Sequence, residues 1–271
     1  MPSKAVAVVV TLSDQEQLTA DEEISLRQLV HFLGHHDKFF VAPDHVRVPR
    51  GDFGVKRFPR RYFGSAAAHS KLLLSPTFYR TFEDYEYILL HHLDALVLQD
   101  RLDAWCAAGF DYIGAPWLPS DDSPWVTVAH VGNGGFSLRN VHSFLKVLGS
   151  RRLAEDPELY WSQFAASRSA PIRYANAWRK YLKRLRLFND VRWQTRRWRM
   201  NEDHFWSKCA VHFVPEFKVA PVEEGLRFAF EVAPRRCLEL NGGELPFGCH
   251  AWPKYDRAFW GPYLVSNGAI H

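Results

Sequence analysis

Residues 85–94 read Tyr85-Glu-Tyr-Ile-Leu-Leu-His-His-Leu-Asp94, and this stretch is the most informative part of the 271-residue chain. The apolar run Tyr87–Leu90 predicts a buried strand, which ends abruptly in His91, His92 and Asp94. Polar residues just beyond the C-terminal end of a buried strand lie where open α/β sheets bind their ligands. An acidic side chain at that place can hold a divalent cation, and the cation can hold a diphosphate.

The segments around this stretch alternate between strand and helix patterns. Residues 5–11 and 38–42 are apolar runs typical of parallel strands that are covered on both faces. Further strands are expected at 55–58 and 111–114, and helices at 21–34, 66–74, 76–82, 101–108, 141–148 and from Asn201 on. This alternation predicts an α/β fold, a parallel sheet with crossover helices. From residue 211 on, we expect short strands that alternate with turns.

The composition suits one large α/β domain or two small ones, because 47% of the residues are hydrophobic. Four cysteines lie far apart and form no CxxC pair: Cys106, Cys209, Cys237 and Cys249. We therefore expect reduced thiols rather than a zinc site or a disulfide framework. The apolar run at residues 5–10 is too short to span a membrane and lacks a signal-peptide cleavage pattern, so we infer a cytoplasmic protein.

A basic stretch lies within residues 151–200, which we interpret as a partly helical insertion. Residues 173–199 hold ten Lys or Arg and one acid, Asp190, with tryptophans between them. This pattern is typical of a solvated helix face, of a helix at a membrane surface, or of a nucleic-acid patch. Nucleic acid is disfavoured because the rest of the chain is slightly acidic and carries no known reader motif, and we expect no nucleic-acid partner.

Three further motifs could carry chemistry. Gly132-Asn-Gly-Gly135 lacks the GxGxxG spacing and the P-loop lysine, so it predicts either a hairpin or a backbone wall against a ligand. Glu202-Asp203 opens a predicted helix, where the pair could stabilise the helix dipole or act as a general base. His250 is either a structural histidine or, with a carboxylate from elsewhere, a metal ligand.

Taken in order, these segments resemble a GT-A glycosyltransferase, and most of all an uncharacterised bacterial family of glycosyltransferase-like domains. The segments that carry the resemblance are 22–27, 85–89, 93–95, 111–117, 132–139, Glu202-Asp203 and 245–252. The resemblance spans nearly the whole chain, and its specificity comes from the combination and order of the motifs. Residues 151–200 are its poorest part.

The resemblance implies a single GT-A, Rossmann-like domain over 1–271, with a mixed, mostly parallel sheet flanked by helices. Residues 1–117 would form the nucleotide-binding half, and residues 118–271, with the basic insertion, the acceptor-binding half. The implied activity is that of a hexosyltransferase. It would move a sugar from a nucleoside-diphosphate sugar, UDP being favoured, to a hydroxyl of a glycan or lipid-linked acceptor. Bacterial surface polysaccharide or glycoconjugate synthesis is the implied setting.

On the donor side, the resemblance assigns contacts with the base or ribose to Thr11 and Ser13. It places Lys71 where a basic residue faces the nucleotide. Gly134 and Gly135 match the loop near the donor sugar.

On the catalytic side, Asp94 matches the last acid of the DxD motif, and His250 matches a late histidine that touches metal or diphosphate. A divalent cation, Mn²⁺ or Mg²⁺, is therefore implied, with Asp94 and His250 as its ligands. Asp203 matches the acid that deprotonates the acceptor hydroxyl in inverting members, and Glu202 would orient the acceptor or Asp203.

The chain departs from the family pattern at the first acid of DxD, where His92 stands. His92 either binds a borderline metal such as Mn²⁺ directly or contacts ribose or phosphate. Because hard cations favour oxygen ligands, a single carboxylate makes a weak Mg²⁺ site.

Two other functions stay open. A sugar nucleotidyltransferase shares the α/β plan, but it would show a Gly-rich signature with a basic residue directly after the first strand, where this chain has Thr11-Leu-Ser. A non-catalytic carbohydrate- or membrane-binding protein would use residues 173–199 without needing Glu202 or Asp203. The same basic stretch would place a transferase at the periphery of the inner membrane.

Overall fold

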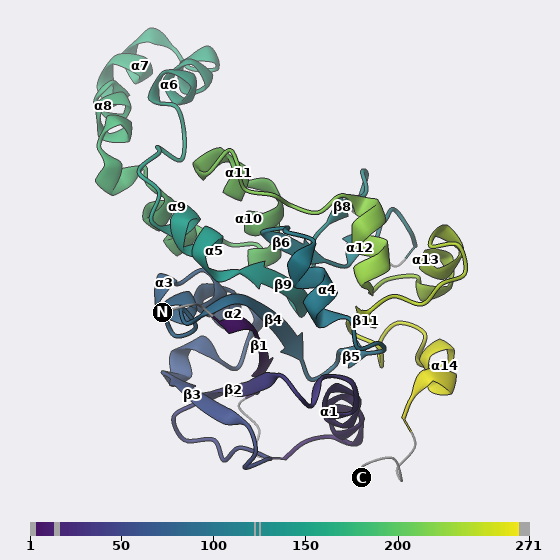
Figure 1. The fold of residues 1–271 in the computed structure, drawn as a ribbon. Coiled ribbons are helices and arrows are strands. Elements are labelled where there is room, and N and C mark those ends of the chain that lie inside the picture. Colours follow the sequence, from purple (N-terminus) through teal and green to yellow (C-terminus); the bar gives the residue numbers. More distant parts are fainter. Residues whose placement is uncertain (1–3, 14–16, 122, 125, 266–271) are drawn as a thin grey trace.

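The computed structural model describes residues 4–13, 17–121, 123–124 and 126–265, and a six-stranded sheet forms its centre (Figure 1). The strands follow the order β3-β2-β1-β4-β9-β6. Their bounds are β1 Lys4–Thr11, β2 Asp37–Pro43, β3 Gly54–Phe58, β4 Tyr85–His92, β6 Tyr112–Gly114 and β9 Phe136–Asn140. The first four are parallel, whereas β9 runs antiparallel to both β4 and β6. The expected mixed, mostly parallel sheet is therefore confirmed.

The two central strands are buried on both faces, as their apolar runs predicted. In β1, Val8 and Val10 pack into the core on one face of the sheet, while Val9 packs into the core on the other. β4 alternates in the same way, because side chains of a strand point to opposite faces in turn. The register pairs Thr11 with His92, so the ends of both strands meet at one edge of the sheet.

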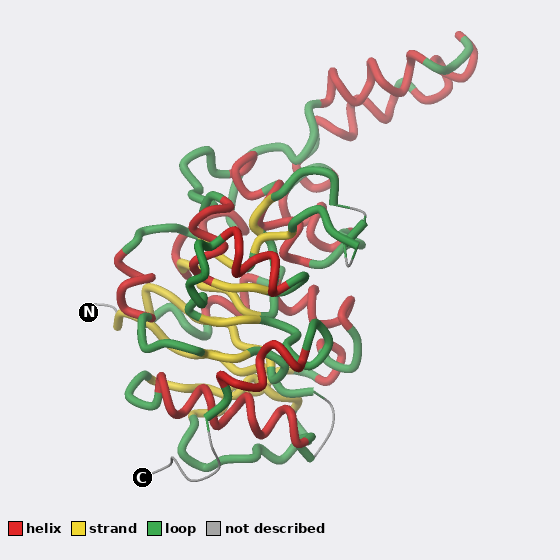
Figure 2. Tube along the Cα trace, turned by 90° about the vertical axis from the view of Figure 1, so that its right-hand side faces the viewer, coloured by secondary structure: helices red, strands yellow, loops and turns green. Residues whose placement is uncertain are grey.

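Helices cover both faces of the sheet (Figure 2). Those of the first half are α1 Ala20–Leu33, α2 Ala66–Leu73, α3 Pro76–Arg80, α4 Leu102–Ala107 and α5 Val141–Leu148. α1 begins at a capping box in which Thr19 and Glu22 satisfy each other's backbone N–H groups. Ser65 caps α2, which leads from the end of η1 (Arg60–Tyr62) back toward the edge where β1 and β4 end.

A small second sheet brings distant parts of the chain to that edge. Its strands are β5 Leu96–Val97, β10 Ala229–Phe230 and β11 Gly248–Cys249, in the order β10-β11-β5. Asp94 precedes β5 and His250 follows β11, and these two strands pair antiparallel. The backbone N–H of Trp252 also donates to the carbonyl of Asp94 at 3.1 Å. Pairing of β5 with β11 therefore fixes Asp94 beside His250. A further two-stranded ribbon joins β7 Pro116–Trp117 to β8 His130–Val131.

The expectation of alternating short strands from residue 211 on is wrong. Most regular structure there is helical, with α11 Ala210–Phe213, α12 Val222–Phe228, α13 Pro234–Leu240, α14 Arg257–Trp260 and η3 Gly261–Tyr263. These helices are two turns long or less, so their apolar residues show almost no helical period. The aromatic residues Phe228 and Phe230 favour strands, but only Ala229–Phe230 forms one.

Residues 151–200 form a helical arm that projects from the body of the protein (Figure 2). Its helices are α6 Pro157–Ala166, α7 Ala170–Asn176, α8 Trp178–Arg184, η2 Arg186–Phe188 and α9 Val191–Arg197. No residue of α6, α7 or α8 is buried, whereas α9 buries Val191 and Thr195 against the body. α10 (Glu202–Lys208) follows directly, so the base of the arm adjoins the predicted acid pair. Within the described part of the chain, no helix is long and apolar enough to cross a membrane.

Candidate active site

Two adjoining cavities lie where β1 and β4 end. The first, of about 690 Å³, is lined by Thr11, Ser13 and Asp94 among others. The second, of about 240 Å³, is lined by a set that includes Gly134, Gly135, Glu202, Asp203 and His250. Ala66, His69 and His92 line both cavities. The fold thus brings nine of the ten residues expected from the sequence to one place.

The tenth residue, Lys71, lies apart from the others. It is exposed on α2 and belongs to the lining of neither cavity. His69, two residues earlier on the same helix, lines both of them. Two residues correspond to about 200° of rotation around a helix, so the two side chains leave α2 in nearly opposite directions. A wider depression of about 840 Å³ near Gln99 and Leu245 contains none of the expected residues.

Asp94, His250 and Glu231 form a row of charged groups at the junction of the cavities. Nε2 of His250 lies 3.3 Å from Oδ1 of Asp94, and its Nδ1 lies 2.9 Å from Oε1 of Glu231. Burial alone would lower the pKa of His250, but the two carboxylates raise it to about 10. Burial would raise the pKa of Asp94, yet the adjacent His250 holds it well below its usual range. The ring is therefore an imidazolium at neutral pH while nothing else binds Asp94.

His92 takes the place of the first DxD acid and contacts a second histidine. Its Nε2 lies 3.0 Å from Nε2 of His69. Burial lowers the pKa of His69 to about 4, and burial with the neighbouring His69 lowers that of His92 well below its ordinary value. Both rings are therefore neutral at pH 7. The backbone of His92 is fixed as well, because its N–H donates to the carbonyl of Gly135 at 2.7 Å.

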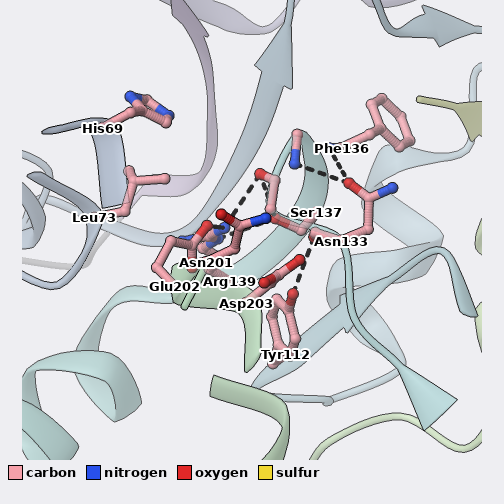
Figure 3. A network of polar contacts seen from close by, with 12 residues as sticks. His69, Leu73, Tyr112, Asn133, Phe136, Ser137, Arg139, Asn201, Glu202 and Asp203 are labelled. Atoms are coloured by element: carbon pink, nitrogen blue, oxygen red, sulfur yellow. Dashed lines mark hydrogen bonds and ion pairs between the residues drawn. The ribbon is translucent and has the colours of Figure 1, made fainter. Parts of the chain in front are cut away.

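The glycine loop is shaped by the protein's own side chains. A Cβ at Gly135 would collide with the ring of His250, and a Cβ at Gly134 would collide with the carboxylate of Glu202. Asn133, at φ 71°, accepts hydrogen bonds through Oδ1 from the N–H groups of Gly135 and Phe136 (Figure 3). The glycines therefore admit His250 and Glu202 to the cavity wall, in addition to any close approach of a ligand.

Glu202 and Asp203 have different surroundings. Oε1 of Glu202 accepts from Nη2 of Arg139 at 2.8 Å, and both side chains are buried (Figure 3). Burial raises the pKa of Glu202 to about 7, against the opposing effect of the guanidinium. Arg139 also donates to the carbonyl of Gly134 at 3.2 Å and to the hydroxyl of Tyr79 at 3.0 Å. Glu202 thus ties the start of α10 to the glycine loop.

Among the described residues, no basic side chain forms an ion pair with Asp203. One of its oxygens accepts from the backbone N–H of His204 at 2.7 Å, and the side chain is 4% exposed. Burial raises the pKa of Asp203. Figure 3 shows its carboxylate beside Asn133 and Tyr112. A buried carboxylate with a raised pKa at a cavity wall is suited to accept a proton.

Three lining residues that make polar contacts in the site had no role assigned from the sequence: His69, Glu231 and Trp117. Trp117 donates from Nε1 to Oε2 of Glu231 at 3.1 Å, so Glu231 joins the indole to His250. Glu231 directly follows the short strand Ala229–Phe230 and carries the same signal that marked Asp94, a polar residue after a buried strand. His69 lies inside a helix and gives no comparable signal.

The residues at the junction fit a divalent cation. Ligand atoms of His92, Asp94 and His250 all lie within 4.8 Å of one another, and the three side chains are partly buried. Two imidazole rings, which bind metals in their neutral form, and one carboxylate make a mixed nitrogen and oxygen donor set, which suits borderline metals. Glu231 on the far ring nitrogen of His250 is the outer contact that such a ligand uses. A second group of three, His35, His36 and Asp103, lies at the protein surface.

The model of a family described as "Protein of unknown function (DUF5672)" matches residues 52–250. No curated protein matches the chain. Among solved structures, the apo-form glycosyltransferase GlyE of Streptococcus pneumoniae TIGR4 is 12% identical with a TM-score of 0.45, over 98% of this chain and 61% of that one. This chain therefore spans about three fifths of that protein's length.

A glycosyltransferase involved in glycosylation of the major capsid of PBCV-1 is 9% identical with a TM-score of 0.47, over 94% of this chain and 96% of that one. The mannosyltransferase Ktr4p of S. cerevisiae, solved in complex with GDP, is 8% identical with a TM-score of 0.36, over 52% of this chain and 57% of that one. Two of these three proteins are named glycosyltransferases and the third a mannosyltransferase. At these identities and scores, the likeness carries no information on substrate or reaction.

Proposed function

Because this chain belongs to the DUF5672 family, a family of proteins of unknown function, we propose a function from its site: transfer of a hexose from a nucleoside-diphosphate sugar to an acceptor hydroxyl. One observation carries the proposal. A candidate cation pair, Asp94 with His250, and a buried acid, Asp203, line adjoining cavities at the carboxyl end of the sheet. Open α/β sheets bind their ligands at this edge.

The larger cavity suits the nucleotide. Thr11 and Ser13, at the end of β1, would contact the base or ribose, and Asp94 would hold the cation that neutralises the diphosphate. Bound to Asp94 and His250, a divalent cation would stabilise the negative charge that develops on the departing diphosphate. UDP is the nucleotide that we expect. Lys71 stays a predicted nucleotide contact, although its present place is solvent-exposed.

The smaller cavity suits the transferred sugar and the acceptor. Gly134 and Gly135 would lie against the sugar, and Asp203 would take the proton of the attacking hydroxyl. With Asp203 as the base, we propose in-line attack of the acceptor hydroxyl and inversion at the anomeric carbon. Glu202 supports this role indirectly, because its pairing with Arg139 fixes the first turn of α10 and so the backbone of Asp203.

The helical arm supports a location at a membrane surface with a glycan or lipid-linked acceptor. α6 to α8 and the residues after them leave Tyr174, Tyr181 and Leu187 more than 60% exposed among basic side chains. Exposed aromatic and aliphatic side chains that alternate with Lys and Arg are typical of helices at anionic lipid surfaces. Synthesis of bacterial surface polysaccharide or glycoconjugate is the setting that we propose.

The decisive experiment is a thermal-shift screen of nucleotide sugars with and without Mn²⁺, followed by donor hydrolysis and transfer assays. A donor that binds the folded protein raises its melting temperature. Replacing the base, in Asp203→Asn, should lower transfer by about 10²–10⁴-fold without weakening donor binding. Asp44→Asn, at an exposed turn, is the matched control.

The outcomes separate the competing functions. A protein that binds no nucleotide sugar, with or without metal, would not be a transferase and would favour the non-catalytic binder. Formation of a nucleotide sugar from a sugar phosphate and a nucleoside triphosphate would indicate a nucleotidyltransferase. Full transfer activity in the correctly folded Asp203→Asn protein would exclude Asp203 as the base.

A further inference from the structure

An aromatic platform of four side chains adjoins the smaller cavity: Trp117, His130, Trp198 and His204. We propose that this platform binds the acceptor, and that the acceptor is therefore a glycan whose sugar rings pack against it. The inference rests on the proposed function and names the class of acceptor within it. The hydroxyl that attacks would belong to a sugar ring rather than to a lipid chain.

The four rings contact one another in a connected group. The centroids of Trp117 and His204 are 6.5 Å apart with their planes inclined by 32°, and the same distance and angle relate His204 to Trp198. His130 meets Trp117 edge to face at 5.5 Å and His204 at 6.1 Å. Each ring is partly exposed. A ligand that covers such rings gains the free energy of removing apolar surface from water.

The platform lies on the side of the proposed base, away from the nucleotide. Trp117 lines the smaller cavity, as Asp203 does, and neither belongs to the lining of the larger one. His204 directly follows Asp203, and its backbone N–H donates to that carboxylate at 2.7 Å. Trp198 donates from Nε1 to the carbonyl of Asn201, which also lines the smaller cavity, at 3.0 Å. A sugar ring on Trp117 would therefore lie beside Asp203, and further units would extend over His204 toward Trp198.

Two rings of the platform are held in place by the protein itself. Nε1 of Trp117 donates to Oε2 of Glu231 at 3.1 Å, and a Cβ on Gly132 would lie 3.4 Å from the indole, so the backbone packs closely against this ring. The ring of Trp198 meets that of Phe205 edge to face, with centroids 5.4 Å apart. Because side chains that are already ordered lose little entropy on binding, these rings are prepared for a ligand.

The polar atoms of the platform favour a sugar over a lipid chain. A pyranose ring has C–H groups on its faces and hydroxyls around its edge, so it suits a surface that combines aromatic faces with a few polar atoms. His130 and His204 place imidazole nitrogens among the rings, and the carboxylate of Asp203 lies next to them. A hydroxyl can donate to or accept from these groups, whereas an aliphatic chain would cover them without a hydrogen bond, at a cost in free energy.

Transfer to acceptors of defined class tests the proposal. The donor is the nucleotide sugar that the unaltered chain binds and hydrolyses. The glycan probes are methyl glycosides of glucose, galactose, mannose and N-acetylglucosamine with one to four units, and the lipid probes are dodecanol and farnesyl phosphate. We expect transfer to at least one series of glycosides and none to the lipids. Calorimetry with the same glycosides, without donor, measures binding to the platform directly.

Variants locate the contact. Trp198→Ala should raise the acceptor KM about tenfold for glycosides of three or four units and affect the monosaccharide less, because this ring lies beyond the first sugar. Trp198→Phe keeps an aromatic face and should restore most of the affinity. Trp117→Ala should weaken binding of every glycoside and lower transfer relative to donor hydrolysis. Tyr263→Ala, which removes an exposed aromatic ring outside both cavities, is the control, and circular dichroism checks that each variant is folded.

Three results would overturn the proposal. Folded Trp198→Ala and Trp117→Ala proteins with the acceptor KM of the unaltered chain would remove the platform from the acceptor site. Transfer to a lipid probe but to no glycoside would exclude a glycan acceptor, as would donor hydrolysis without binding or glycosylation of any glycoside. The proposed transferase fails separately, if no nucleotide sugar is bound or hydrolysed. Glycoside binding that Trp198→Ala weakens would then still support the platform.

Discussion

Glu231 accepts a hydrogen bond from Nδ1 of His250 at 2.9 Å, and the other nitrogen of that ring lies 3.3 Å from Asp94. The carboxylate of Glu231 is 14% exposed and also receives the indole N–H of Trp117. One side chain therefore sets the rotation of the ring on which the proposed cation binding depends. Glu231 should therefore be tested by substitution together with the residues that would bind the ion.

Glu231→Gln is expected to weaken cation binding about 10–100-fold, the usual cost of losing an outer contact to a histidine ligand. The amide keeps the shape of the side chain, but as a neutral acceptor it no longer raises the basicity of the ring nitrogen that would bind the cation, and it holds the ring less firmly. Calorimetric titration with Mn²⁺ measures the effect. Glu223→Gln, at an exposed position of α12, should bind Mn²⁺ as the unaltered chain does. Equal affinities in the two variants would show that Glu231 does not orient the ring.

Cation binding is expected to release close to one proton per ion at pH 7–8. In the folded chain the pKa of His250 is raised to about 10, so the ring is protonated in this pH range, and a cation on Nε2 must displace that proton. Affinity should therefore rise as pH increases from 7 toward 10. Calorimetry in buffers of different ionisation enthalpy counts the protons. Zero release at pH 7.5 would mean that His250 is not a ligand or is already neutral.

His91→Leu is expected to stabilise the fold by about 1–3 kcal/mol, the cost of burying a polar group without a partner. His91 is fully buried against Phe136, and among the described residues neither of its ring nitrogens has a hydrogen-bond partner. Urea unfolding at pH 7.5 measures the change. An unchanged or lower free energy of unfolding would indicate that the ring has a partner in solution, such as a buried water.

The same residue makes stability depend on pH. Burial lowers the pKa of His91 to about 4, so the unfolded chain binds the proton more readily between pH 6.5 and 4. Above pH 6.5 the ring is neutral in both the folded and the unfolded chain, so it causes no loss of stability with pH. As pH falls from 6.5 through 4, the unfolded chain binds the proton first, and the free energy of unfolding decreases. The leucine variant should therefore lose less stability than the unaltered chain between pH 6.5 and pH 4. His69, whose pKa is also about 4, contributes in the same direction in both proteins.

Much of the fold could be predicted from local pattern. β1 and β4 were recognisable because strands buried on both faces are continuous apolar runs, and α1 because its acidic first turn and the glycine that closes it are local. The helices after residue 211 were missed because they are too short to show a period.

The site could be predicted only where a motif marked it. Asp94, Asp203 and His250 each stand in a recognisable motif, whereas His69 becomes relevant only when α2 packs over the end of β4. Glu231 depends likewise on the pairing of β10, β11 and β5, which joins segments more than 130 residues apart in sequence. Which side chain of a helix faces the cavity, as His69 does and Lys71 does not, depends on tertiary packing and cannot be predicted from the composition.

Gly135→Ala is expected to reduce cation affinity more than tenfold and to destabilise the fold. An added Cβ would occupy the place of the His250 ring, and the carbonyl of the same residue holds the backbone of His92 at 2.7 Å. Gly51→Ala is the matched control, since a Cβ there meets nothing within 4 Å and its φ is not positive. Melting temperature and Mn²⁺ titration provide the two readouts. Normal affinity in Gly135→Ala would mean that His250 can leave its position without loss of the site.

Charge reversal in the arm is expected to abolish binding to anionic vesicles. Replacing Arg184, Arg186, Arg196 and Arg197 by Glu changes the charge of the arm by eight units, and each basic residue near an anionic surface contributes about 1 kcal/mol of attraction. Sedimentation with phosphatidylglycerol-containing and neutral vesicles measures binding. The control reverses four exposed basic residues of the body, Arg47, Arg80, Arg101 and Lys208. Should both variants bind equally, or the unaltered chain fail to bind at all, the arm would not be a membrane contact, and its exposed aromatic side chains would have to serve another partner.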